Sequence, residues 1–184
     1  MRRSGASTGA TYRVVEYLER EALVDRTPRG PITAVAWRRM LRRWSEDYGF
    51  QRSNTVGRYL QPRGLPVLLD RLAAAPDLQY AVTGSLAARR LAPYADSLLA
   101  LVYVDDAEAA VQHLDLRPVD SGANVLLAAS DYDIVFERRV TFDGVEYAAP
   151  SQTAVDLLTG PGRSPAEAEA LLDWMEAHEF DWRR

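Results

Sequence analysis

Residues 98–104, LLALVYV, run through Asp105-Asp106 into residues 107–114, AEAAVQHL, and this stretch decides the fold class. Seven consecutive apolar residues are typical of a central strand that is buried on both faces. Asp106 stands at the expected N-cap of the following helix, where a carboxylate accepts hydrogen bonds from amides of the first turn. A buried strand that leads directly into a helix indicates an α/β arrangement.

The rest of the carboxy-terminal region continues this alternation of strands and helices. Strands are predicted at residues 78–82, 124–128, 134–140 and 145–148, the last two forming a hairpin around Phe142-Asp143-Gly144. Helices are predicted at residues 86–91, 151–158 and 164–178. We expect a mixed α/β (α+β) domain over residues 78–184.

The amino-terminal region is predicted to be mostly helical. Residues 12–22 follow the capping sequence Ser7-Thr8 and carry apolar side chains at helical spacing. Residues 23–26 and 32–35 flank a turn rich in proline and glycine, which predicts a short hairpin. Further helices are predicted at residues 37–48 and 56–75. We expect a separate basic region over residues 1–77.

Charge is distributed unevenly along the chain. The net charge of −4 combines a basic half, residues 1–75 with 14 arginines and 7 acidic residues, with an acidic half of 8 arginines and 19 acidic residues. A basic half joined to an acidic half is a pattern found in chains that contact nucleic acid. Every basic residue is arginine, whose guanidinium suits bidentate contact with phosphate.

Composition excludes several classes of protein. With 47% hydrophobic and 26% charged residues, the chain is typical of a folded, soluble protein. No apolar run approaches the roughly 18 residues that cross a membrane, and Met1-Arg2-Arg3 leads into a polar stretch, so we expect a cytoplasmic protein. There is no cysteine, and the only histidines are His113 and His178. We therefore expect no metal ion, no cofactor and no catalytic residue.

Residues 7–33, STGATYRVVEYLEREALVDRTPRGPIT, resemble the recognition helix and wing of winged helix-turn-helix transcription regulators. In that family the helix enters the major groove of DNA and the wing touches the backbone. One or two helices precede the recognition helix in a complete winged helix, and six residues precede Ser7 here, so we expect a partial one. The expected base or phosphate contacts are Ser7, Thr8, Thr11 and Arg13, and the expected phosphate contacts are Arg2, Arg3, Arg26 and Arg29.

The carboxy-terminal region resembles the C-terminal domain of AbiEi-type antitoxins, the transcription regulators of type IV (abortive infection) toxin–antitoxin systems. The resemblance lies in YAVTGSLAARRLAP (residues 80–93), VYVDD (102–106) and VEYAAPSQTAVDLLTGPGR (145–163). It implies a protein that binds double-stranded DNA, represses its own operon and counteracts a nucleotidyltransferase-type toxin. Whether such a protein is a monomer or a homodimer stays open.

Two other classes of function remain as alternatives. Thr83-Gly84-Ser85 is similar to the Gly-Ser turn of nucleotidyltransferases, which hold two metal ions with carboxylates at alternate positions of a strand. Asp105 and Asp106 are adjacent and point to opposite faces, and Asp131-Tyr132-Asp133 begins 46 residues after Ser85. We therefore expect a distantly nucleotidyltransferase-like fold that is not an enzyme. The second alternative is a protein-interaction module that does not bind DNA.

Overall fold

The computed structural model describes residues 7–28, 30–130 and 132–183. The chain divides into two compact units, the amino-terminal unit Met1–Trp44 and the sheet unit Ser45–Arg184. The division falls inside the last turn of one helix, and it lies well before the boundary expected after residue 77. Residues 45–77 belong to the sheet unit because they supply it with a strand and a helix.

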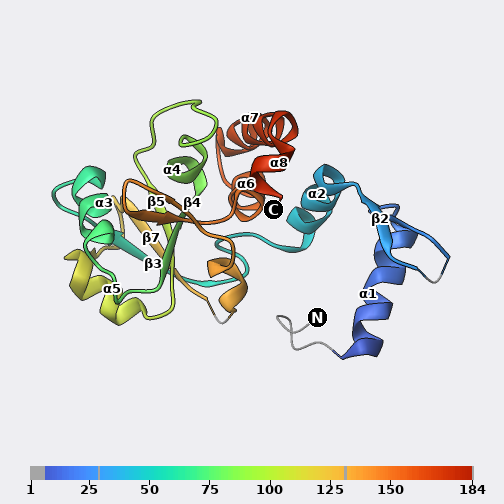
Figure 1. The fold of residues 1–184 in the computed structure, drawn as a ribbon. Coiled ribbons are helices and arrows are strands. Elements are labelled where there is room, and N and C mark those ends of the chain that lie inside the picture. The colour runs from blue at the N-terminus through green and yellow to red at the C-terminus, as the bar shows by residue number, and fades with distance from the viewer. Residues whose placement is uncertain (1–6, 29, 131, 184) are drawn as a thin grey trace. The chain divides into compact units, whose positions relative to one another are not determined.

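The amino-terminal unit consists of a helix followed by a hairpin. Its elements are α1 (Thr8–Arg20), β1 (Val24–Arg26), β2 (Ile32–Val35) and the start of α2 (Trp37–Asp47) (Figure 1). Ser7 caps α1, and β1 pairs antiparallel with β2, so that Val24 lies opposite Val35. The predicted helix and hairpin are confirmed, although α1 begins four residues earlier than expected.

Helix α1 ends in a left-handed turn formed by an alanine. Leu23 N donates to Leu18 O at 2.8 Å and Ala22 N donates to Glu19 O at 2.9 Å, the two hydrogen bonds of a Schellman motif. Ala22 carries the positive φ of 53° that this motif requires. The Arg39 guanidinium donates to the carbonyl oxygen of Ala22 at 3.2 Å and fastens α2 to the end of α1. Glycine is the residue that adopts this conformation without steric conflict.

Replacing Ala22 with glycine is expected to stabilise α1 by about 1 kcal/mol, because glycine removes the contact between Cβ and the backbone in the left-handed region. Hydrogen exchange of the α1 amides, followed by NMR, should then slow by about fivefold. The matched control is Ala10→Gly inside the same helix, which is expected to speed exchange because glycine weakens a helix interior. Equal acceleration by both variants would contradict the prediction.

In the described part of the sheet unit, seven strands form one mixed sheet in the order β6-β3-β7-β5-β4-β9-β8. The strands are β3 (Thr55–Leu60), β4 (Tyr80–Thr83), β5 (Ala100–Val104), β6 (Arg117–Pro118), β7 (Val125–Ala129), β8 (Val140–Phe142) and β9 (Val145–Tyr147). The pairs β5–β7 and β4–β9 are parallel, and the other pairs are antiparallel. The expected mixed α/β class is confirmed.

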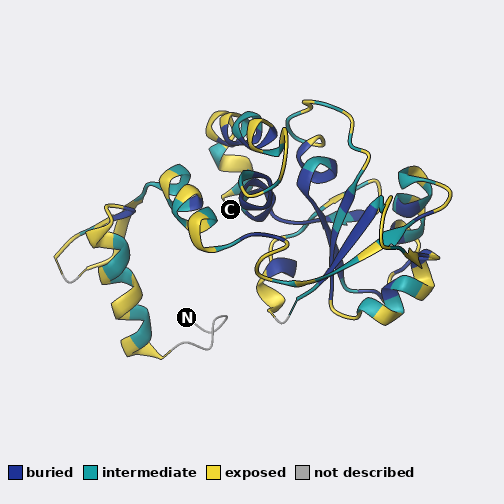
Figure 2. Cartoon of the chain, turned by 180° about the vertical axis from the view of Figure 1, so that it is seen from behind, coloured by how far each residue is buried: buried dark blue, intermediate teal, exposed yellow. Residues whose placement is uncertain are grey.

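Helices cover both faces of this sheet. They are α3 (Leu65–Ala73), α4 (Gly84–Ala88), α5 (Ala107–Leu114), the 3₁₀ helix η1 (Asp133–Phe136), α6 (Pro150–Leu158), α7 (Ser164–Ala177) and α8 (Glu179–Trp182). On one face α3 and α5 bury Leu68 and Leu114 in one cluster with Val102, and on the other face Phe50 packs against Tyr103. Figure 2 shows the central strands of the sheet largely in the colour of buried residues. In the described ranges, no helix has both the length and the apolar character to cross a membrane.

The buried strand and its helix form as the sequence predicts. Val102 and Val104 of β5 are fully buried, and α5 spans the predicted residues 107–114. The Asp106 carboxylate accepts from the backbone amides of Glu108 at 2.9 Å and Ala109 at 3.0 Å. The predicted N-cap is therefore confirmed.

Two predicted elements are wrong. Residues 56–75 were expected to form one or two helices around residues 61–64. The second part does form α3, but residues 55–60 form β3, which pairs with β6 and β7 on its two sides. Residues 134–140 were expected to be a strand, but most of them form η1 and the turn after it. For β3 the strand partners are distant in the chain, and their pairing outweighs local propensity. The 3₁₀ helix η1 instead closes through local hydrogen bonds and buries Val135 and Phe136.

Candidate functional site

The residues expected to contact DNA from α1 differ in what their side chains already bind. Ser7 Oγ accepts from Ala10 N at 3.2 Å, and Thr11 Oγ1 donates to Ser7 O at 3.1 Å. Both hydroxyls therefore stabilise the first turn of the helix. Thr8 and Arg13 are exposed, so these two side chains can reach a ligand without disturbing the cap.

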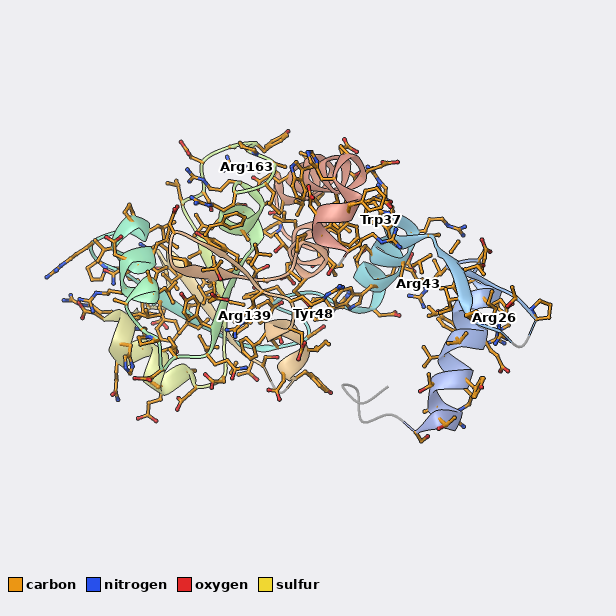
Figure 3. All side chains as sticks on the ribbon, viewed as in Figure 1. Arg26, Trp37, Arg43, Tyr48, Arg139 and Arg163 are labelled. Atoms are coloured by element: carbon orange, nitrogen blue, oxygen red, sulfur yellow. The ribbon has the colours of Figure 1, made fainter. Side chains whose placement is uncertain are left out.

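Arg26 has a structural role inside the amino-terminal unit. Its Nε lies 2.7 Å from Glu19 Oε2, and its side chain is 17% exposed. Figure 3 labels Arg26 on the hairpin side of α1. The ion pair connects β1 to α1. The carboxylate of Glu19 also partly neutralises the positive charge with which Arg26 would bind a phosphate. The other expected phosphate contacts, Arg2, Arg3 and Arg29, lie outside the described residues.

The boundary between the units sharpens the contrast in charge. The amino-terminal unit has ten arginines and four acidic residues, a net charge of +6. The sheet unit has twelve arginines and 22 acidic residues, a net charge of −10. An excess of arginine of this size is the charge balance that favours contact with a polyanion.

Helix α1 also exposes apolar side chains. None of its residues is buried, and Figure 2 accordingly draws it only in teal and yellow. Tyr12 is 58% exposed and Val14 is 55% exposed. On the neighbouring hairpin Ile32 is exposed as well. Exposed apolar side chains of this size are a feature of protein contact surfaces when they form a patch.

The sheet unit contains a buried cluster of polar side chains around Asp156 of α6. Thr83 Oγ1 donates to Asp156 Oδ2 at 2.6 Å, and Tyr103 OH donates to Asp156 Oδ1 at 2.8 Å. Gln152 Nε2, one turn earlier on α6, donates to the same Oδ1 at 3.0 Å. Tyr48 adds a hydrogen bond to the Tyr103 hydroxyl. These contacts join α6 to β4, β5 and the segment after α2.

Burial governs how this cluster titrates. Removal from water raises the pKa of the Asp156 carboxyl to about 7, although hydrogen bonds from Thr83 and Tyr103 partly oppose that change. Burial also raises the pKa of the Tyr103 hydroxyl, as does the negative charge of Asp156. The tyrosine stays protonated as a donor, and the carboxyl gains or loses its proton near neutral pH.

A cavity of about 650 Å³ lies beside this cluster. Apolar walls come from Phe50, Leu99 and Leu101, and Arg52 and Arg163 are also among the lining residues. Figure 3 labels Arg163 close to α4 and α7. The volume falls within the range of small-molecule sites, about 300–1,000 Å³.

The Thr83-Gly84-Ser85 turn has a structural explanation. Gly84 adopts φ +66°, and a Cβ atom at this position would lie 2.9 Å from Leu101 Cδ1. Only glycine allows β4 to turn into α4 so close to β5. The Thr83 hydroxyl donates its hydrogen bond to Asp156, whereas Ser85 lines the cavity.

The described carboxylates among those considered for metal binding do not form a metal site. Asp105 Oδ1 accepts from Asp106 N at 2.8 Å, and Asp106 caps α5. Asp133 is exposed on η1, and Asp131 lies outside the described residues. In the part of the chain that the structure describes, no three histidine, aspartate or glutamate side chains form a group that could hold a metal ion.

The sequence analysis did not single out Asp156, Gln152, Tyr103 or Tyr48. One signal was present, because Gln152 and Asp156 are four residues apart within the predicted helix and so share a face. The partners Thr83 and Tyr103 come from strands far away in the chain, and sequence spacing does not indicate them.

Comparison with known proteins identifies no relative: no family model, no curated protein and no solved structure matches the chain.

Proposed function

We propose that the chain is a DNA-binding transcriptional regulator of the antitoxin type, which represses its own operon and has no catalytic activity. The observation that carries the proposal is a capped helix joined directly to an antiparallel hairpin, in a unit with a net charge of +6. This order and this charge are those of a recognition helix and wing.

Each part of the amino-terminal unit then has a distinct task. Thr8 and Arg13 are exposed on α1 and contact the DNA groove or its phosphates. Arg26 instead holds the hairpin to α1 through Glu19, so that the hairpin has a defined position beside the helix. Arg39 fixes the end of α1 from α2. Binding free energy comes mainly from arginine–phosphate contacts and therefore depends on salt.

The test is a fluorescence-anisotropy titration of a duplex from the gene's own upstream region, at about 50 and 200 mM salt. We expect affinity to fall steeply at the higher salt. Arg13→Gln is expected to weaken binding by about fivefold, and to reduce the slope of log affinity against log salt by about 1. The matched control is Arg117→Gln in the sheet unit, where Arg117 is exposed on the short strand β6. It should bind like the unaltered protein.

DNA affinity that does not respond to salt would contradict the proposal. So would equal effects of Arg13→Gln and Arg117→Gln, because that result would mean that the amino-terminal unit carries no special part of the binding. A scrambled duplex of the same length separates sequence-selective binding from attraction to any phosphate backbone.

A second candidate function is a protein-interaction module, and the exposed apolar side chains of α1 favour it. In that case Tyr12→Ser and Val14→Ser would abolish binding to a protein partner, and no DNA titration would be seen. The DNA titration separates the two candidate functions. DNA binding depends on Arg13, whereas docking of a protein depends on Tyr12 and Val14.

The proposal includes neutralisation of a nucleotidyltransferase-type toxin by the acidic sheet unit. Its support is the AbiEi-like order of residues 80–163 together with the net charge of −10. Co-expression with a nucleotidyltransferase from the same operon tests it, through rescue of growth and recovery of a complex. Failure of both would remove toxin capture from the proposal and leave DNA binding to be judged separately.

A further inference from the structure

We propose that the cavity of the sheet unit binds a small organic anion, with an apolar or aromatic body and a carboxylate or phosphate head group. The cavity contains both kinds of surface that such a molecule needs. Phe50, Leu99 and Leu101 supply apolar walls, and the arginines Arg52 and Arg163 line the cavity together with the carboxyl groups of Asp156 and Glu167. Small-molecule sites commonly combine a mostly apolar lining with a few convergent polar groups.

The arginines are anchored in a way that leaves donors for a ligand. Arg163 Nε donates to Glu167 Oε1 at 2.7 Å, and its Nη2 donates to the carbonyl oxygen of Asp96. Arg52 donates through Nη2 to Glu46 O at 3.0 Å. A guanidinium has five N–H donors, so Nη1 of each arginine keeps both of its own. A held guanidinium loses less freedom when an anion binds.

The two loops that carry these arginines lie against each other. A Cβ atom on Gly49 would lie 3.4 Å from the Thr159 side chain, so the segment before Arg52 touches the turn before Arg163. That turn is tightly built, because a Cβ on Gly160 would lie 2.7 Å from Ser164 Cβ. The two arginines are therefore carried by neighbouring segments of the cavity lining.

Two serine hydroxyls also line the cavity. Ser85 and Ser164 are half-buried there, and neither side chain has a hydrogen-bond partner among the described residues. Glu167 is buried and its charge is offset by Arg163, which leaves Arg52 as the positive charge without a carboxylate partner in the described part of the chain. Hydroxyl and guanidinium donors together suit carboxylate or phosphate oxygens.

The test is an NMR titration of the full chain with phenyl phosphate and with benzoate, using phenol and inorganic phosphate as comparison compounds. We expect saturable shifts of the Ser85, Leu101 and Gly160 amides with at least one aromatic anion. Phenol and inorganic phosphate should each bind at least about tenfold more weakly, because each lacks half of the recognised chemistry. The stronger of the two anions identifies the head group.

Variants decide whether the arginines recognise the anion. Arg52→Gln and Arg163→Gln are each expected to weaken binding by about tenfold, whereas Arg117→Gln should have no effect. Arg52 donates to backbone carbonyls alone, so its replacement keeps the test valid if Arg163→Gln disturbs folding. Absence of shifts at about 10 mM ligand overturns the proposal, as does phenol binding as tightly as both anions or unchanged affinity in the Arg52 variant.

Discussion

Replacing Asp156 with alanine is expected to lower the free energy of unfolding of the sheet unit by about 2–4 kcal/mol at about pH 5. The substitution leaves the Thr83 hydroxyl without its partner in a buried site and takes an acceptor from Tyr103 and Gln152. It also leaves an empty space between α6 and the sheet. Urea denaturation followed by tryptophan fluorescence measures the loss, because Trp174 and Trp182 lie in this unit.

The isosteric change Asp156→Asn separates hydrogen bonding from charge. An amide oxygen can replace Oδ1 as the acceptor for Tyr103 and Gln152, and the amide nitrogen can donate to Thr83 Oγ1. This variant is therefore expected to keep most of the stability at about pH 5. Asp133→Ala, at an exposed position, is the control and should change stability by less than about 0.5 kcal/mol. Equal losses at Asp156 and Asp133 would contradict the prediction.

The second large effect is a fall in stability as pH rises towards neutrality. The pKa of Asp156 is about 7 in the folded protein and near 3.8 when the chain is unfolded, so between these values the folded state binds more protons. The contribution of Asp156 to the free energy of unfolding is therefore largest below about pH 4. It is lost progressively up to about pH 7, with a total change of roughly 4 kcal/mol. The groups that face this carboxyl are the neutral side chains of Thr83, Tyr103, Gln152 and Tyr48.

Urea titrations at several pH values between about 4 and 8 measure this dependence. Asp156→Asn cannot ionise and is expected to flatten the pH profile. The many exposed carboxylates titrate in the same way in the unaltered protein and in Asp156→Asn. The difference between their free energies of unfolding at each pH therefore reports Asp156 alone. Parallel profiles would show that Asp156 does not change its proton over this range.

The elements that could be predicted from the sequence are those marked by residues close together in the chain. Residues 100–104 and 107–114 were predicted because an apolar run and a capping aspartate act within a few positions. The hairpin of residues 24–35 was predicted because proline and glycine mark its turn. Residues 55–60 were mistaken for helix because the partners of this half-exposed strand, β6 and β7, lie more than 50 residues later.

The candidate sites show the same limit. Exposed Thr8 and Arg13 could be proposed from residue type and helix position alone. The pairing of Arg26 with Glu19 could not, because it requires the hairpin to fold back on α1. The Asp156 cluster joins a helix, two strands and a loop, so its members became recognisable only when the sheet brought them together.

The strand order also has a consequence for synthesis on the ribosome. Thr55 of β3 pairs with Ala129 of β7, and Val82 of β4 pairs with Tyr147 of β9. At about 5–20 residues per second, β3 is made roughly 3–14 seconds before β7 can pair with it. The helix and hairpin of the amino-terminal unit need only local contacts and can form during this interval. The nascent sheet unit meanwhile presents an unpaired strand, and an unpaired strand is a template for pairing with another chain.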